Sequence, residues 1–212
     1  MKSPELNINC GVPQGSVLGP MLFLIYINDI FMASTNNKIR LFADDSNVFI
    51  VNQDLIQLFD NGNTVINQLS YWFACNKLSI NLEKTSYMIF KPNSFVNNLI
   101  TSNNLNISLN GVNIARTDCS KYLGVYIDEM LSWREHVNFV NNKLLSFIGL
   151  LYKRKNLIPV SCGKMLYFSL VYSYLIYGLE VYGIAKTNVL RPLTITCNRI
   201  LRLLQDVSRE TA

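Results

Sequence analysis

Two adjacent aspartates stand between two short apolar runs, and this pattern constrains the local fold more than any other in the chain. The segment from Ile39 to Ile50 reads IRLFADDSNVFI. Apolar residues on both sides of a turn-favouring pair predict a β-hairpin, with strands at 38–43 and 47–51 and a tight acidic turn at 44–46. Strands anchored in the core would hold both carboxylates at an exposed tip.

The two carboxylates, Asp44 and Asp45, allow two interpretations. Neighbouring carboxylates repel each other unless they share a cation. Mg²⁺ prefers oxygen ligands and keeps waters and substrate phosphates as its remaining ligands, so a metal-dependent phosphoryl-transfer site is one interpretation. The other is a solvated Asp-Asp turn, since aspartate favours turns through its own hydrogen bonds. Taken alone, the segment favours the solvated turn.

Hydrophobic periodicity predicts an α+β first part followed by an all-helical part. A helix is expected at 19–33, after a glycine- and proline-rich turn at 10–16. Asn110-Gly111 predicts a type I′ turn between two short strands. The other expected elements are strands near 86–91, 107–109, 112–115 and 121–127, and helices at about 63–76, 133–152, 159–185 and 188–206.

Charge is distributed unevenly along the 212 residues, which carry a net charge of +5. Residues 1–142 contain 9 basic and 11 acidic side chains, whereas residues 143–212 contain 10 basic and 3 acidic ones. This asymmetry is compatible with a C-terminal part that faces a polyanion, and equally with a solvated helical surface. It agrees with a domain boundary near residue 130.

Cysteine and histidine usage argues against several classes of protein. Five scattered cysteines and one histidine, His136, support neither a disulfide framework nor a zinc site, and we expect His136 to be structural. We therefore expect an intracellular protein of the nucleus or cytoplasm, not a secreted one. The strongly hydrophobic segment 165–185 contains five tyrosines and Glu180, so a buried helix is expected there in preference to a membrane span.

Several motifs in a fixed order resemble a known family. Residues 11–20 read GVPQGSVLGP and lead into the apolar run MLFLIYINDI, which FADD follows at 42–45. The same order, GxPQGSxLGPxLFxLYxNDL and then [FY]ADD, is found in the reverse transcriptases of non-LTR (LINE-type) retrotransposons. The resemblance continues through NKLSIN at 76–81, YLGVYID at 122–128 and WREH at 133–136, and so covers nearly the whole chain.

The resemblance implies an α+β fold and a polymerase function. The fold would be a partial polymerase palm at 1–130, an antiparallel sheet with packed helices that carries the ADD hairpin and a primer-grip-like hairpin. An all-helical thumb-like or connection-like region would follow at 131–212. The activity would be RNA-directed DNA synthesis with two Mg²⁺ ions, acting on an RNA template, a DNA primer and dNTPs.

The resemblance also assigns roles to individual residues. Asp44 would bind metal with Asp45 as a weaker ligand, and Lys84 would lie near the pyrophosphate, although a surface lysine is nearly as good an interpretation. The assignment of a primer grip depends wholly on the resemblance. The remaining expected site residues are Gly11, Pro13, Gln14, Gly15, Ser16, Phe42 and Ala43 at the template and nucleotide, Tyr122, Leu123 and Gly124 in the primer grip, and Lys143, Lys153, Arg154 and Lys155 on the nucleic-acid backbone.

Part of the family pattern is missing from this sequence. The family's first catalytic aspartate lies in an FxDxxKAFD motif several dozen residues before the GxPQG turn, and only ten residues precede Gly11 here. Two carboxylates from one hairpin cannot bracket two ions. We therefore expect an N-terminally truncated reverse transcriptase that is inactive alone, with a separate chain as one source of the missing fingers and first aspartate. The alternatives are a non-catalytic nucleic-acid-binding relic, a Mg²⁺-dependent nuclease and, well below these, a membrane-associated tyrosine-rich helix.

Overall fold

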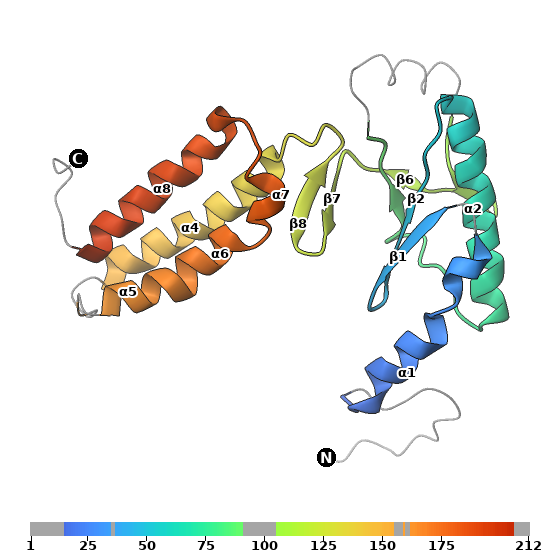
Figure 1. Cartoon of the computed structure of the whole chain (residues 1–212), viewed down its shortest axis with the longest axis horizontal. Helices are drawn as coiled ribbons and strands as arrows, with labels where there is room; N and C mark the ends of the chain where they lie inside the picture. Colours follow the sequence, from blue (N-terminus) through green and yellow to red (C-terminus); the bar gives the residue numbers. More distant parts are fainter. Residues whose placement is uncertain (1–14, 35–36, 91–104, 155–158, 160–161, 206–212) are drawn as a thin grey trace. The chain divides into compact units, whose positions relative to one another are not determined.

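The computed structural model describes residues 15–34, 37–90, 105–154, 159 and 162–205 (Figure 1). The chain divides into two units, the first formed by residues 1–87 and 97–115 and the second by residues 88–96 and 116–212. Helices and small sheets are mixed, and in the described residues the expected antiparallel sheet is present as four two-stranded pairs: β1–β2, β3–β6, β4–β5 and β7–β8. No helix in this part of the chain is long and apolar enough to cross a membrane.

The first unit is organised around one long helix. The elements are α1 (Leu18–Ile27), the 3₁₀ helix η1 (Ile30–Ala33), β1 (Lys38–Phe42), β2 (Asp45–Phe49), α2 (Leu55–Cys75), β3 (Ser86–Tyr87), β4 (Ser108–Leu109) and β5 (Val112–Asn113). The last strand, β6 (Ala115–Arg116), ends the first unit and begins the second. The core contains Ile30, Ile39, Val65 and Leu69, so that η1, β1 and α2 pack together.

Several sequence predictions in this unit differ from the structure. The helix expected at 19–33 is divided into α1 and η1, and the strand expected near 86–91 is only the two-residue β3. The helix expected at 63–76 begins earlier, at Leu55, because the Asp54 carboxylate caps it by accepting a hydrogen bond from the Ile56 N–H at 3.3 Å. The acidic turn expected at 44–46 is tighter: only residues 43 and 44 form the loop, and Asp45 already begins β2. The turn at Asn110-Gly111 is confirmed, with φ of +52° and +79° as a type I′ turn requires.

The second unit is a hairpin followed by helices. It contains β7 (Cys119–Tyr122), β8 (Val125–Asp128), α4 (Arg134–Arg154), α5 (Gly163–Leu166), the π-helix η4 (Tyr167–Tyr172), α6 (Ser173–Ile176), α7 (Leu179–Tyr182) and α8 (Thr187–Gln205). Buried residues of α4 such as Val140 and Leu144 pack in one core with Ile200 of α8 and Val171 of η4.

Two further predictions are corrected here. The single strand expected at 121–127 is a hairpin, because Leu123 and Gly124 both adopt positive φ and reverse the chain between β7 and β8. The helix expected at 159–185 is broken after α6, where Tyr177 is extended and Gly178 is left-handed with φ of +72°. Glycine adopts this conformation without the steric cost of a Cβ atom, so Tyr177-Gly178 redirects the chain into α7.

Candidate active-site hairpin and nucleic-acid interface

The β1–β2 hairpin places the two aspartates at its end. Phe42 pairs with Asp45, which leaves Ala43 and Asp44 as a two-residue loop. Ala43 has φ of +51°, the left-handed conformation that the primed hairpin turns require. Asp44 and Asp45 are both exposed. The sequence thus predicted the hairpin and its carboxylates correctly, with the loop one residue earlier than expected.

The two faces of this hairpin differ in chemistry. Side chains alternate along a strand, so Ile39, Leu41 and Val48 lie on the face that packs into the core with α2. Phe42 and Asp45 lie on the opposite face, and both are exposed. The second face is therefore free, within the described residues, to meet a ligand.

The carboxylate pair offers part of the donor set of a Mg²⁺ site. Asp44 and Asp45 supply the oxygen ligands that Mg²⁺ prefers. In residues 15–34, 37–90, 105–154, 159 and 162–205, however, no group of three or more His, Cys, Asp or Glu side chains could hold a metal ion. The pair fits part of a magnesium site and does not complete the two-ion site that the resemblance implies.

The other residues expected near the nucleotide are less closely assembled. Lys84 is exposed in a turn organised by Asn81, whose carbonyl oxygen accepts its backbone N–H at 3.2 Å. Among the described residues, no hydrogen bond or ion pair joins Lys84 to either aspartate. Ser16 accepts a hydrogen bond from the Gly19 N–H at 3.0 Å and so caps the first turn of α1, and Gly15 precedes it with φ of +85°. Gly11, Pro13 and Gln14 lie outside the described residues.

The β7–β8 hairpin carries the residues expected in the primer grip. Tyr122 pairs with Val125, and Leu123 and Gly124 form the two-residue loop, with φ of +47° and +84°. Both φ values are positive, as a type I′ turn requires. Tyr177 contacts this loop from the helical segment: its hydroxyl donates a hydrogen bond to the Leu123 carbonyl oxygen at 2.5 Å.

Tyr177 was not predicted from the sequence as a partner of this loop. The signal that could have indicated it is the Tyr-Gly pair at the helix break, because such a break frees an aromatic side chain to leave the helix surface. His136 is buried on α4, and its Nδ1 accepts the Tyr126 N–H at 3.3 Å. Burial lowers the pKa of His136 below its usual value.

Several basic side chains lie on the second unit. Lys143 and Lys153 are exposed on α4, and the Lys143 Nζ lies 5.6 Å from the centre of the Phe139 ring. The backbone of Arg154 ends the same helix, and Lys155 lies outside the described residues. Lys121 on β7 has its Nζ at 5.6 Å from the same Phe139 ring. Two cations therefore flank one aromatic ring beside the β7–β8 hairpin.

Comparison with known proteins identifies the family. A family model described as reverse transcriptase (RNA-dependent DNA polymerase) matches residues 2–127, more than half of the chain, and the chain belongs to this family. Within it, the chain is of the non-LTR retrotransposon type, as its relatives indicate.

The relatives are proteins of insect mobile elements. The chain is 28% identical over 211 residues to the RNA-directed DNA polymerase from mobile element jockey of Drosophila melanogaster, covering 95% of this chain and 22% of the relative. It is 24% identical over 209 residues to the probable RNA-directed DNA polymerase from transposon X-element of the same species, with the same coverage of both. It is 25% identical over 147 residues (68% of this chain, 14% of the relative) to the Pol polyprotein from type-1 retrotransposable element R1 of Bradysia coprophila. No solved structure matches the chain.

Proposed function

We propose that this chain supplies the catalytic hairpin and the primer-binding region of an RNA-directed DNA polymerase, and that it acts only together with further polypeptide. The observation that carries the proposal is the Asp44-Asp45 hairpin, presented on an exposed face inside the segment that matches the reverse transcriptase family. The chain spans about a fifth (22%) of the length of its jockey and X-element relatives. We therefore propose that it contributes to the activity of a longer polymerase.

The hairpin would contribute part of a magnesium site. Asp44 and Asp45 would hold the metal together with a carboxylate from another segment, since the described residues offer no third ligand. When bound, two Mg²⁺ ions would activate the primer 3′-hydroxyl and stabilise the leaving pyrophosphate. The task of this chain is to fix two carboxylates at a rigid loop, which Ile39 and its core neighbours accomplish by anchoring the strand beneath. Lys84 is proposed to neutralise charge near the pyrophosphate.

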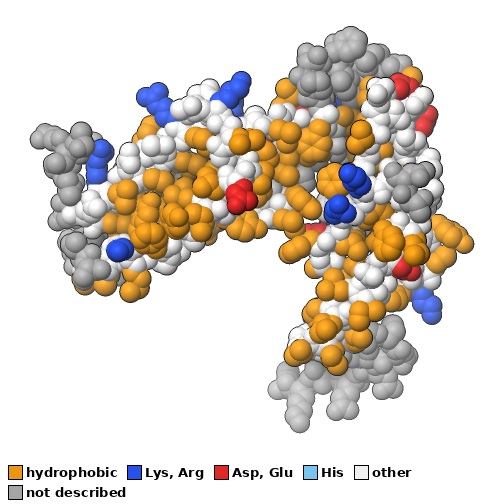
Figure 2. All heavy atoms as spheres, viewed as in Figure 1, with side chains coloured by type: hydrophobic (Ala, Val, Ile, Leu, Met, Phe, Trp, Pro, Cys, Tyr) orange, Lys and Arg blue, Asp and Glu red, His pale blue; other side chains and the backbone are white. Residues whose placement is uncertain are grey.

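An exposed apolar helix supports the need for further polypeptide. Helix α1 consists of apolar residues together with one glycine, one proline and one tyrosine. A helix that is hydrophobic on all sides is normally buried. Here Met21, Leu22 and Ile25 are exposed, and the exposed fraction of Ile25 is 72%. Figure 2 shows hydrophobic side chains along this helix. We propose that the fingers and the FxDxxKAFD segment, in the same or a separate chain, cover α1.

The second unit is proposed to bind the primer and template. Residues 1–130 would form the palm part and 131–212 the thumb-like part, with the Tyr122-Leu123-Gly124 hairpin contacting the primer end. Lys143, Lys153, Arg154 and Lys155 would contact phosphates, a contact that depends on charge and not on sequence. The excess of basic over acidic residues after position 142 supports this assignment. Gly15 and Ser16 would continue the template- and nucleotide-binding turn begun by Gly11, Pro13 and Gln14, with Phe42 and Ala43 opposite.

A second candidate function is a non-catalytic nucleic-acid-binding protein. The incomplete donor set around Asp44 favours it, because the described residues alone cannot hold two ions. In this case the basic helices would bind duplex, and Asp44 would have no role in binding.

Primer extension on an RNA template separates these functions. The chain is assayed alone and mixed with a polypeptide that carries the family's fingers and FxDxxKAFD motif, with Mg²⁺ and dNTPs. We expect extension only in the mixture, lost by about 100-fold or more in Asp44→Asn, because metal-bound carboxylates stabilise several kcal/mol of transition-state charge. Asp60→Asn, an exposed aspartate of α2, is the matched control and should leave extension unchanged.

Each alternative result has a definite meaning. Extension by the chain alone would overturn the requirement for further polypeptide. Mg²⁺-independent binding of primer–template without extension in the mixture would establish the non-catalytic function. Cleavage of labelled DNA in the absence of dNTPs, lost in Asp44→Asn, would instead establish a nuclease.

A further inference from the structure

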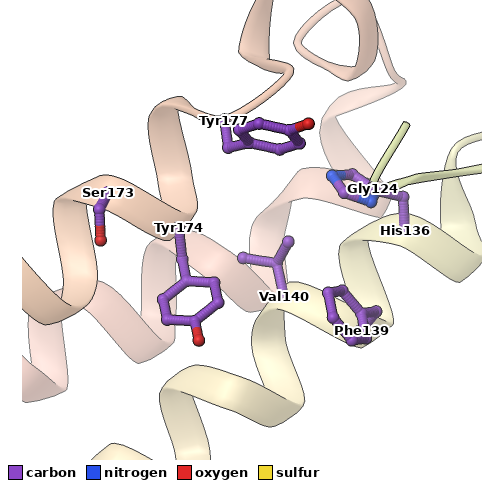
Figure 3. Close-up of a pocket in the computed structure, with 7 residues that line it drawn as sticks. All are labelled: Gly124, His136, Phe139, Val140, Ser173, Tyr174 and Tyr177. Carbon is purple, nitrogen blue, oxygen red and sulfur yellow. The ribbon is translucent and has the colours of Figure 1, made fainter. Parts of the chain in front are cut away.

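A cavity of about 320 Å³ lies in the second unit beneath the loop of the β7–β8 hairpin. The residues that line it are Gly124 of the loop, His136 and Phe139 of α4, Ser173 and Tyr174 of α6, and Tyr177 at the end of α6 (Figure 3). Its lining is mostly aromatic and apolar, and its volume lies at the lower end of the range for small-molecule pockets.

His136, which lines the cavity, carries one polar atom that has no partner among the described residues. His136 is 1% exposed, and its Nδ1 accepts the Tyr126 N–H, so the proton of the neutral imidazole resides on Nε2. Nε2 is buried and makes no hydrogen bond to any described residue. Figure 3 shows the His136 ring among the residues that line the cavity. A buried donor left unpaired is costly, and a ligand with an acceptor atom would remove that cost.

The walls of the cavity favour a flat ligand. The hydrogen bond from the Tyr177 hydroxyl to the Leu123 carbonyl oxygen fixes the plane of one aromatic ring at the cavity. Tyr174, a residue that is 42% exposed, forms a second wall, and Phe139 a third. Aromatic rings held in fixed orientations bind planar groups by stacking.

Positive charge stands next to the same cavity. The Nζ atoms of Lys121 and Lys143 each lie 5.6 Å from the centre of the Phe139 ring. Both lysine side chains are exposed, so they are accessible to an anion outside the cavity. A suitable ligand therefore combines a flat group that carries an acceptor atom with a neighbouring negative charge.

We infer that this cavity binds one unpaired nucleobase of a nucleic-acid strand, with His136 Nε2–H donating to a ring nitrogen or carbonyl oxygen of the base. Tyr174 and Tyr177 stack on the base, and Lys121 and Lys143 contact the adjoining phosphates. The inference rests on the proposed nucleic-acid binding of the second unit and adds a base-holding site to it. It separates a contact with the base from the contacts with phosphates that the basic helices make.

The test compares two probes on the full chain. One is a fluorescein-labelled single-stranded DNA of mixed sequence, and the other is the same strand with abasic residues, which keeps the phosphates and removes the bases. We expect the strand with bases to bind at least about fivefold tighter. Stacking of one base on an aromatic side chain contributes at least this much to affinity when that side chain is replaced by alanine.

Two tyrosines of similar exposure provide the matched variants. Tyr174→Ala should reduce the ratio of the two affinities to near one without changing the affinity for the abasic strand. Tyr172 is 43% exposed on the same helical segment but does not line the cavity, so Tyr172→Ala should leave the ratio unchanged. Photocrosslinking of a strand that contains 5-iodouracil should label the peptide with Tyr174 and Tyr177. His136→Gln, which keeps an N–H donor, should retain more of the ratio than His136→Leu, provided that both melt as cooperatively as the native chain.

The outcomes distinguish this inference from the function on which it rests. Equal binding of both probes by the native chain, or an equal loss in Tyr172→Ala and Tyr174→Ala, would overturn the base site and leave polyanion binding in place. Failure to bind either probe, and primer–template as well, would overturn the nucleic-acid binding of the second unit itself.

Discussion

The hydroxyl of Tyr177 donates a hydrogen bond to the carbonyl oxygen of Leu123 at 2.5 Å, across 54 residues of sequence. The same ring covers the neighbouring Gly124 so closely that a Cβ atom there would lie 2.8 Å from the tyrosine Cε1. The Tyr177 side chain therefore holds the loop of the β7–β8 hairpin. It can reach the loop because α6 ends just before Tyr177 and Gly178. A tight turn and a helix end, distant in sequence, form one structural element.

Gly124→Ala should destabilise the chain more than Gly111→Ala. Both glycines have positive φ, and alanine in that conformation costs about 1–2 kcal/mol. Only Gly124 has a ring in the way, whereas a Cβ at Gly111 would meet nothing within 4 Å. Chemical denaturation measures the free energy of unfolding of the two variants. In a chain that also carries Tyr177→Ala, Gly124→Ala should cost no more stability than Gly111→Ala. An equal loss of stability in Gly124→Ala and Gly111→Ala would contradict the contact between Tyr177 and Gly124.

Asp128→Ala should lower the free energy of unfolding by about 2 kcal/mol, as loss of hydrogen bonds to a charged acceptor does. The Asp128 carboxylate accepts the N–H groups of Met130, Ser132 and Trp133 at 3.1, 3.0 and 2.9 Å, and so fixes the turn that starts α4. Thermal or urea unfolding provides the measurement. Asp118→Ala, at an exposed aspartate near the same hairpin, is the control and should change stability little. A similar loss in both variants would assign the effect to general charge.

The stability of the chain should fall as the pH falls below about 6.5, the ordinary pKa of histidine. Burial lowers the pKa of His136 in the folded state, so between that lowered value and 6.5 the unfolded chain binds the proton and the folded chain does not. The expected slope approaches 1.4 kcal/mol per pH unit in this window. His136 is the single histidine, so its titration can be followed by NMR without assignment, and His136→Gln should remove the slope. A flat stability profile through this window would contradict the buried neutral imidazole.

Alkylation of the native chain should modify Cys75 well before Cys197. Cys75 is exposed at the end of α2, whereas burial raises the pKa of the Cys197 thiol on α8 and so disfavours the reactive thiolate. Mass spectrometry after brief iodoacetamide treatment identifies the order. Denaturation before treatment should make the two rates equal, and an unchanged order in the denatured chain would indicate a cause other than burial.

Patterns that depend on sequence neighbours were predictable. The apolar runs around Asp44-Asp45 indicated β1 and β2, Asn110-Gly111 indicated its type I′ turn, and long periodic runs indicated α4 and α8 within two residues of their ends. The reverse transcriptase family followed from the order of the motifs, and the comparisons confirm it. Periodicity alone predicted one strand at 121–127, whereas the resemblance implied the hairpin at Leu123-Gly124 that the structure contains. The local signal at Gly178, which ends α6, was not used. The metal, primer and phosphate roles assigned by resemblance stay predictions.

The sequence by itself determined the order of strands and helices, the family, and the carboxylate pair at a hairpin end, because each follows from the side chains of consecutive residues. Only the tertiary structure decided that Tyr177 holds Leu123 and Gly124, and that His136 is buried with one nitrogen paired and the other free among the described residues. Contacts of this kind join residues that are far apart in the chain. Their formation depends on how helices pack, and no local periodicity encodes which residue of one element meets which residue of another.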